Sequence, residues 1–357
     1  MNKLDIDYQN LVKDILENGV EKNTRNGSTL SVFSRQIRHN MNDGFPLLTT
    51  KRLSFKTIVT ELLWFLSGST NIKYLVDNNC NIWNGDAYKS YKLRHNFQIN
   101  QGIDILSQDE FVNKIKTDDN FAKEFGELGP IYGKQWRRWK KVDEVWDENL
   151  HPPFKIENIE LIDQIQNLIN DLKTNPDSRR MVVNAWSVHD LPNMVLPPCH
   201  YSFQLYTREL NLDERFKLWE NLENKDVLDF PIGPLSDEQY HEILNDLDVP
   251  NRSVSLMFNM RSTDVGLGLP FNLASYGLLL MIIAKEVNMV PEELIYNGAD
   301  VHLYSNHVNT IKNQLELEPY KLPTVDFIKR DNLEYIISDF ILNNYESHPT
   351  IKLPLSN

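Results

Sequence analysis

Apolar residues follow helical spacing in three segments of this 357-residue chain. They predict a helix over residues 8–16, which Gly19 is placed to end, and a mostly apolar helix over residues 55–66. A longer helix is expected over residues 269–287, because Pro270 stands in its first turn, where the missing N–H of proline costs least. Its nearly continuous apolar character predicts that this third helix is buried.

Other segments alternate between apolar and polar residues with a period of two, which is typical of strands with two distinct faces. Residues 201–206 and 254–260 alternate in this way, and the apolar run at residues 181–186 predicts a buried strand. Residues 24–33 are expected to form a polar loop that leads into a strand, and residues 300–304 a short strand. The strands at 201–206 and 254–260 would naturally pair.

Two polar segments, residues 84–126 and 207–252, interrupt this pattern, and the second separates the two strands that would pair. Each contains a capping box, in which a serine and a Glu or Gln three positions later satisfy each other's helix-start donors: Ser107 with Glu110, and Ser236 with Gln239. We expect both segments to be surface insertions of a single domain that spans residues 1–357.

The charge balance excludes one class of partner. The formal net charge is −13 and the sequence pI is about 5.2. Such a field repels polyanions, so we expect no general nucleic-acid binding, although a local arginine cluster can still hold a small anion. Any phosphate bound here is expected to belong to a small ligand.

Cysteine usage and the apolar runs indicate a compartment. Cys80 and Cys199 provide neither a disulfide framework nor a metal-ligand spacing, which favours a reducing compartment and no bound metal. Residues 1–7 lack a secretory signal, and the longest apolar run, residues 276–284, is far shorter than the roughly 20 residues of a membrane span. We expect a cytoplasmic protein without a membrane partner.

Cys199 is a candidate nucleophile. It follows Pro197 and Pro198 and precedes a predicted strand, so its thiol would stand at a strand edge that a ligand can reach. A thiol of pKa about 8.5 is only a few per cent thiolate at neutral pH, so a cation such as Arg261 would have to activate it. The alternative is a small buried hydrophobic residue, the more usual place of a free cysteine.

Four arginines could converge on one phosphate, because the planar guanidinium fork matches phosphate oxygens: Arg25, Arg179, Arg180 and Arg261. For the adjacent pair Arg179-Arg180 the alternative is an exposed charged turn. Glu61 lies among apolar residues of its predicted helix, which would raise the pKa of its carboxyl and suit it to proton transfer. Exposure of Glu61 to solvent would exclude that role.

Several side chains could recognise a nucleotide. The carboxamide of Asn272 offers an acceptor and a donor that complement O4 and N3–H of uracil, whereas cytosine reverses this pattern; the alternative is a helix N-cap. His302 and Tyr304 lie on one face of a predicted strand and could bind a sugar, or simply pack. Aromatic residues that could stack on a flat cofactor, or fill the core, are Trp83, Tyr132 and Trp136. Together with Cys199 and Arg261, this set suits covalent chemistry on a phosphorylated pyrimidine.

In their order along the chain, these motifs resemble those of the thymidylate synthase family. The matching segments are residues 44–52, 61–66, 128–137, 176–180, 198–200, 261–272 and 300–307. The resemblance covers nearly the whole chain apart from the two insertions. It implies an α+β fold, a single domain with surrounding helices and a mixed sheet that is used for dimerisation.

The resemblance also implies a reaction, the reductive methylation of dUMP to dTMP. The co-substrate would be 5,10-methylenetetrahydrofolate, which supplies the one-carbon unit and a hydride and leaves as dihydrofolate; no metal is implied. By this analogy Cys199 attacks C6 of the uracil, with Arg261 beside it. Three residues would handle proton movement: Glu61, Tyr132 and His200.

Binding roles follow from the same resemblance. The phosphate would be held by Arg25, Arg261 and Ser262, together with Arg179 and Arg180 from the partner subunit of a homodimer. The base would be read by Asn272 and the deoxyribose by His302 and Tyr304. The folate would be bound by Trp83, by Asp264, which also serves the nucleotide, and by a C-terminal tail ending in Asn357, which closes over the ligands.

The chain departs from the family pattern at four points, one of which is the absence of a second tryptophan that some members carry shortly after the first. The loop after Arg25 is one residue shorter, Met260 replaces a common glutamine, and Asn357 replaces a small aliphatic terminus. A dUMP hydroxymethylase, in which water in place of hydride quenches the methylene intermediate, therefore stays open. Less favoured alternatives are a Cys-His hydrolase that pairs Cys199 with His302 or His307, and a non-enzymatic nucleotide-binding protein.

Overall fold

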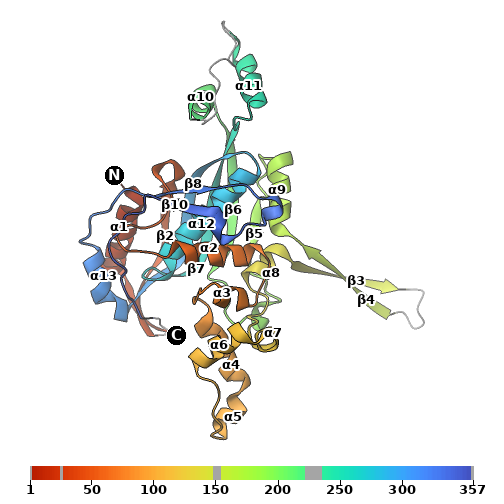
Figure 1. Cartoon of the computed structure of the whole chain (residues 1–357), viewed down its shortest axis with the longest axis vertical. Helices are drawn as coiled ribbons and strands as arrows, with labels where there is room; N and C mark the ends of the chain where they lie inside the picture. The colour runs from red at the N-terminus through yellow and green to blue at the C-terminus, as the bar shows by residue number, and fades with distance from the viewer. Residues whose placement is uncertain (1, 25–26, 148–153, 222–234, 355–357) are drawn as a thin grey trace.

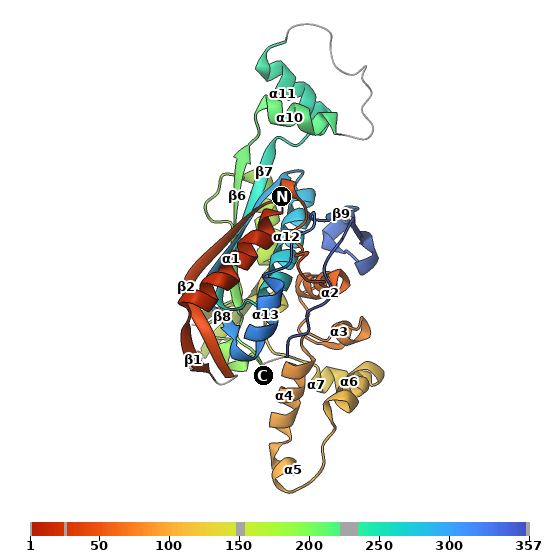
Figure 2. The ribbon, with the colours of Figure 1, turned by 90° about the vertical axis from the view of Figure 1, so that its left-hand side faces the viewer.

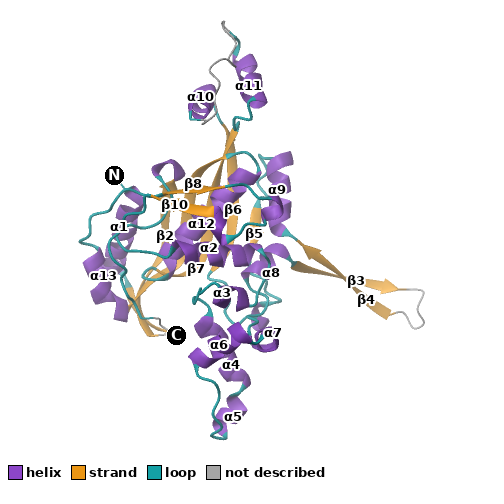
Figure 3. Cartoon of the chain, in the orientation of Figure 1, coloured by secondary structure: helices purple, strands orange, loops and turns teal. Residues whose placement is uncertain are grey.

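A six-stranded mixed sheet forms the centre of the molecule (Figures 1 and 3). The computed structural model describes residues 2–24, 27–147, 154–221 and 235–354. The strands, in their order across the sheet, are β1 (Val20–Thr24), β2 (Gly27–Asn40), β8 (Val290–Tyr304), β7 (Arg252–Asp264), β6 (His200–Glu209) and β5 (Val182–Asn184). Only β7 and β8 pair in parallel, and every other neighbouring pair is antiparallel. The expected α+β architecture with a mixed sheet is confirmed.

Helices cover one face of this sheet, as the side view shows (Figure 2). The central helix α12 (Gly268–Glu286) is apolar on nearly all sides and is buried along most of its length. Its Tyr276 ring stacks on Phe258 of β7 with ring centroids 4.2 Å apart. Around it lie α1 (Lys3–Asn18), α2 (Phe55–Leu66), α8 (Tyr132–Arg137), α9 (Gln164–Thr174) and α13 (Val308–Gln314). By length and composition α12 could cross a membrane, but its burial is that of a core helix.

Three segments project from the sheet and its covering helices (Figure 1). At one end are α4 (Asn84–Arg94), α5 (Asn96–Asn100), α6 (Gln108–Thr117) and α7 (Asp119–Phe125), next to the short α3 (Lys73–Asp77). At the other end are α10 (Leu212–Glu220) and α11 (Asp237–Asp246), and to the side runs a hairpin of β3 (Trp139–Asp147) and β4 (Phe154–Ile162). The two predicted capping boxes are present at the starts of α6 and α11. The hairpin was not predicted, and the division into one domain with two insertions stays a prediction.

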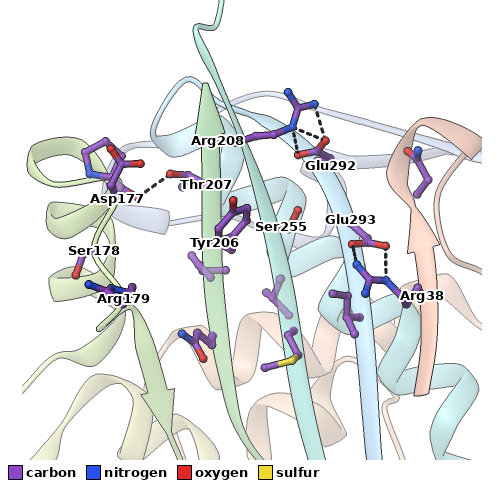
Figure 4. Close-up of a pocket in the computed structure, with 17 residues that line it drawn as sticks. Arg38, Asp177, Ser178, Arg179, Tyr206, Thr207, Arg208, Ser255, Glu292 and Glu293 are labelled. Atoms are coloured by element: carbon purple, nitrogen blue, oxygen red, sulfur yellow. Dashed lines mark hydrogen bonds and ion pairs between the residues drawn. The ribbon is translucent and has the colours of Figure 1, made fainter. Parts of the chain in front are cut away.

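The sheet face away from the helices is open among the described residues. Tyr206 and Val182 are 68% and 48% exposed on β6 and β5. A row of hydrogen-bonded polar side chains crosses four strands of the sheet: Gln36, Asn297, Asn259 and Ser202. Beside this row is a hollow of about 730 Å³, where Arg38 pairs with Glu293, Arg208 pairs with Glu292, and Arg179 stands at the edge (Figure 4).

Two strands are longer in the structure than the sequence pattern predicted. The segment predicted at residues 300–304 is the end of the 15-residue β8, whose first four residues are partly exposed and whose Leu294, Tyr296 and Gly298 are buried in alternation. The predicted loop at residues 24–33 is largely strand, since β1 and β2 pair as a tight hairpin up to Thr24 and Gly27. A separate two-stranded antiparallel sheet near the end of the chain, formed by β9 (Thr324–Phe327) and β10 (Phe340–Asn343), was also not predicted.

Candidate active site

Cys199 lies directly before β6 and lines a cavity of about 780 Å³. Its backbone is fixed on both sides: the Cys199 N–H donates to the hydroxyl of Tyr132 at 2.8 Å, and the Cys199 carbonyl accepts from the Arg261 N–H at 2.9 Å. The side chain is half-buried. The thiol is therefore held at a strand end that faces the cavity, as the sequence predicted.

Arg261 is the cation beside this thiol. Its Nε donates to the carbonyl of Pro198 at 2.8 Å and its Nη2 to the carbonyl of Pro197 at 2.9 Å. The same Nη2 lies 4.0 Å from Sγ of Cys199, and the guanidinium stacks over the ring of Trp186 at 5.4 Å. A positive charge at this distance favours the thiolate over the thiol. The remaining donors of the guanidinium can serve an anion in the cavity.

Glu61 is a buried carboxyl on α2. Its Oε1 accepts a hydrogen bond from the indole N–H of Trp83 at 2.8 Å. Burial raises the pKa of Glu61 to about 7, and the Trp83 hydrogen bond offsets part of this effect. Glu61 can thus be found with or without its proton near neutral pH, which is the property that a proton-transfer group needs.

Behind Cys199, three aromatic side chains form a packed, hydrogen-bonded set. The ring of Tyr132 stacks on His200 with centroids 4.1 Å apart, and Nδ1 of His200 shares a 2.8 Å hydrogen bond with the Tyr276 hydroxyl. Burial lowers the pKa of His200 to about 3, so its imidazole is neutral at physiological pH. Burial also raises the pKa of the Tyr132 and Tyr276 hydroxyls. These groups can donate and accept hydrogen bonds without carrying charge.

Asp264 and Asn272 both lie next to Gly268, the first residue of α12. Oδ1 of Asp264 accepts from the backbone N–H groups of Gly266 at 2.9 Å and Leu267 at 3.2 Å, which fixes the turn into the helix. A methyl group built on Gly268 would lie 3.6 Å from Oδ1 of Asn272 and 3.9 Å from Cβ of Asp264, so the two side chains flank this glycine. Asn272 is the fifth helical residue, and the alternative of an N-cap role is therefore wrong.

The ends of β7 and β8 bring further candidate residues to the cavity that Cys199 lines. Ser262, His302 and Tyr304 line it, and Nδ1 of His302 lies 3.3 Å from Oδ1 of Asp300. Asp300 in turn pairs with Lys22 of β1 at 2.9 Å. Hydroxyl and imidazole groups thus stand in the cavity where a sugar could bind.

Some predicted residues do not join this set. Arg179 and Arg180 are exposed, and Arg179 lines the hollow on the open sheet face instead of the Cys199 cavity. Trp83 is buried against Glu61 and Trp136 is buried in the core, so neither is presented as a stacking surface. Arg25 and Asn357 lie outside the described residues.

Within the part of the chain that the structure describes, no group of three or more His, Cys, Asp or Glu side chains could hold a metal.

The structure adds residues that sequence reasoning missed. Trp186 was assigned to a buried strand, but it lines the cavity beneath Arg261. Lys51 is buried, donates to the carbonyl of Gly266 and has a pKa lowered by burial to about 8; its place in a family motif was the available signal. The fully buried His307 donates from Nε2 to the carbonyl of Pro354 at 2.7 Å, so it ties the C-terminal segment to the site.

Comparison with known proteins supports the family resemblance of the sequence along nearly the whole chain. The thymidylate synthase family profile matches residues 6–227 and 238–357. A thymidylate synthase of Malacoplasma penetrans is 38% identical over 349 residues, which cover 97% of this chain and 98% of that protein. One from Listeria monocytogenes serotype 4a is 36% identical over 367 residues, with 98% and 99% covered, and one from Mycoplasma mobile is 38% identical over 350 residues, with 97% of each covered. The chain therefore belongs to the thymidylate synthase family.

Proposed function

We propose that this protein converts dUMP to dTMP through a covalent bond between Cys199 and C6 of the uracil. The observation that carries this proposal is the thiol of Cys199 4.0 Å from the Arg261 guanidinium, in the lining of a cavity that also presents hydroxyl, imidazole and cationic side chains. Membership of the thymidylate synthase family supports dUMP as the substrate and 5,10-methylenetetrahydrofolate as the co-substrate. The two ligands would meet in the cavity of about 780 Å³.

The residues divide the chemistry among them. The Cys199 thiolate adds to C6, which makes C5 a carbon nucleophile, and covalent attack divides one difficult step into two easier ones. When bound, the co-substrate supplies the methylene group for C5 and, later, the hydride that reduces it. Glu61, with a pKa near 7, accepts the proton lost from C5 through ordered water. Release of Cys199 then frees dTMP, and the co-substrate leaves as dihydrofolate.

The direct test is an assay of the purified protein with dUMP and methylenetetrahydrofolate. We expect dihydrofolate formation and a product with the mass of dTMP. A product with the mass of hydroxymethyl-dUMP, without dihydrofolate, would replace the synthase by the hydroxymethylase. Met260, which first raised that alternative, is buried on the core side of the sheet opposite His200, so it does not line the cavity.

A hydrolase would need an imidazole to take the proton of Cys199. His307 is already engaged by Pro354 and lies 4.0 Å from Asp264, while the cation beside the thiol is Arg261. The hydrolase also leaves Asn272 without a role. Loss of ester hydrolysis in Cys199→Ser, together with no nucleotide binding by the unmodified protein, would favour it over the synthase.

Substitution of Asn272 should change which nucleotide the protein prefers. We expect Asn272→Asp to move nucleotide preference from dUMP toward dCMP by about tenfold or more, because a protonated carboxyl presents the donor and acceptor that cytosine needs. The measurement is kcat/KM, or binding, for both nucleotides at matched salt. An unchanged ratio for the two nucleotides would remove Asn272 from base recognition.

The open sheet face supports a homodimer as the working form. It carries the exposed Tyr206 and Val182 and the row of side-chain amides, and Arg179 stands at its edge rather than at the Cys199 cavity of its own chain (Figure 4). An isologous contact of two such faces would let each chain lend arginines to the other. We propose that Arg179 and Arg180 bind the phosphate in the partner's site. We also propose that the dimer acts in the cytoplasm.

Mixed dimers test this exchange of arginines. Cys199→Ser and the double variant Arg179→Ala/Arg180→Ala should each be inactive alone, because each lacks one part of every site. After random mixing we expect about a quarter of the wild-type activity, since half of the dimers are mixed and each has one complete site. Mixed dimers isolated by two different tags and found inactive would show that the arginines act within their own chain.

A further inference from the structure

The insertion at residues 207–252 begins and ends beside the turn that carries Arg179 and Arg180. It projects from the ends of β6 and β7, where Glu209 and Arg252 are paired residues of the two strands (Figure 1). The turn, which follows α9, lies against the same end of β6, at the edge of the hollow on the open sheet face (Figure 4). The root of the insertion is therefore next to the segment that we assign to the partner's phosphate site.

Two side chains at these strand ends hold the turn. The hydroxyl of Thr207 donates to the carbonyl of Pro176 at 2.6 Å. Nη2 of Arg252 donates to the carboxylate of Asp177, and its Nε donates to the hydroxyl oxygen of Thr207 at 3.3 Å. Asp177 stands two residues before Arg179. A shift of this turn would therefore move the guanidinium groups that follow it.

Arg252 is well placed to fix the direction of the turn. Its side chain is only 10% exposed, whereas the side chains of its two acidic partners, Asp177 and Glu209, are 73% and 83% exposed. Nη1 of Arg252 lies 3.3 Å from Oε1 of Glu209. A buried stem holds the planar fork in one orientation, so the fork can hold a carboxylate that would otherwise turn freely in solvent. Ion pairs with exposed carboxylates add little stability, so the main effect of this pair is on geometry.

The two helices of the insertion set the position of Arg252. The fully buried Arg215 of α10 donates from Nη2 to the side-chain oxygen of Asn245 on α11 at 2.8 Å, which joins the helices. The same guanidinium donates to the carbonyls of Val249 at 3.0 Å and Pro250 at 3.2 Å. The chain is thus held at the two positions shortly before Arg252. The packing of α10 and α11 is transmitted through this residue to the turn.

We propose that Arg252 is a positioning residue for the phosphate site of the partner subunit: through Asp177 it fixes the turn from which Arg179 and Arg180 reach that site. This inference rests on the proposed function, in which those two arginines act in the partner's site. A phosphate contact is made equally in the ground state and in the transition state, so its loss raises KM for dUMP and leaves kcat nearly unchanged. The insertion then supports catalysis in the other chain of the dimer.

The test places Arg252→Gln in two kinds of mixed dimer, isolated with two different tags, each with a single intact thiol. In the first, Arg252→Gln is on the chain that keeps Cys199, and the other chain carries Cys199→Ser. In the second, one chain carries both substitutions and the other is wild type. Both dimers contain one Arg252→Gln chain, so a general loss of folding would affect them alike. The reference is the dimer of a wild-type chain with a Cys199→Ser chain.

In the second dimer we expect a KM for dUMP about tenfold above the reference, with kcat within about twofold, and in the first dimer the KM of the reference. A matched control is Arg330→Gln, because Arg330 pairs with Asp339 at 2.5 Å and lines neither the Cys199 cavity nor the hollow. In the arrangement of the second dimer, this control should keep the reference KM.

Unchanged KM in both mixed dimers would overturn the inference, and so would a raised KM in the first dimer, which would place the effect of Arg252 in its own chain. Failure of the proposed function is seen separately. The Arg179→Ala/Arg180→Ala pair, put in place of Arg252→Gln in the second dimer, would then leave KM at the reference value, or the wild-type protein would form no dTMP.

Discussion

Cys199→Ser is expected to lower turnover by on the order of 10³-fold or more while leaving the dissociation constant of dUMP within about twofold. A serine hydroxyl is far less acidic than a thiol, so the Arg261 guanidinium 4.0 Å away cannot make it a comparable nucleophile. The side chain has nearly the same size, and the backbone bonds to Tyr132 and Arg261 are unaffected. Steady-state kinetics and equilibrium binding of dUMP measure the two quantities.

The second cysteine provides the matched control. Cys80 is buried, and burial raises the pKa of its thiol to about 12, so it is protonated and out of reach of a ligand. Cys80→Ala should therefore keep turnover within about twofold of wild type. Mass spectrometry of denatured protein after incubation with substrates should find the nucleotide on the peptide that contains residue 199. Turnover near the wild-type value in Cys199→Ser would exclude the thiol from the mechanism.

Local pattern was sufficient for two helices next to the site, α2 and α12, and for the end of α1. The helix predicted over residues 55–66 has those bounds in the structure, since Ser54 caps it and its apolar residues are buried. Gly19 ends α1 as predicted, with its N–H bonded to Ile15. The long buried helix extends over Gly268–Glu286, within one residue of the predicted bounds at either end. In these segments, propensity, capping and burial favour the same structure.

Contacts between distant segments were beyond the reach of local pattern. The pairing of β7 with β8 is parallel and brings Asp264 beside His302, a register that no period within either strand encodes. Trp186 stacks on Arg261 and Tyr132 bonds Cys199, although these pairs are far apart in the sequence. Family motifs supplied the identity of most site residues. They gave no role to α4, which lies outside the matching segments although several of its residues line the cavity.

Glu61→Gln is expected to lower turnover by about 10²- to 10³-fold, with dUMP affinity preserved. The amide keeps an oxygen that can accept from the Trp83 indole but cannot take up a proton. The wild-type pH profile should have a limb near pH 7, where Glu61 titrates, and this limb should be missing in the variant. The control is Glu286→Gln: Glu286 is equally buried and accepts a hydrogen bond from Tyr335 at 2.8 Å, at the far end of α12 from the cavity. Its turnover should stay near the wild-type value, and equal losses in both variants would indicate a general effect of altering buried carboxyls.

The same substitution should stabilise the fold in one pH range. The folded protein holds the pKa of Glu61 at about 7, above the ordinary value of 4.5 that applies in the unfolded chain. Between these values the folded state binds more protons, so this carboxyl makes the free energy of unfolding fall as pH rises from about 4.5 to 7, by up to about 3 kcal/mol. Glu61→Gln removes that loss. In urea unfolding, the free energy of unfolding of the variant minus that of the wild type should therefore be larger at pH 8 than at pH 4.5. A stability difference that is the same at both pH values would show that burial does not hold the proton on Glu61, and its assignment as the proton-transfer group would then lose its physical basis.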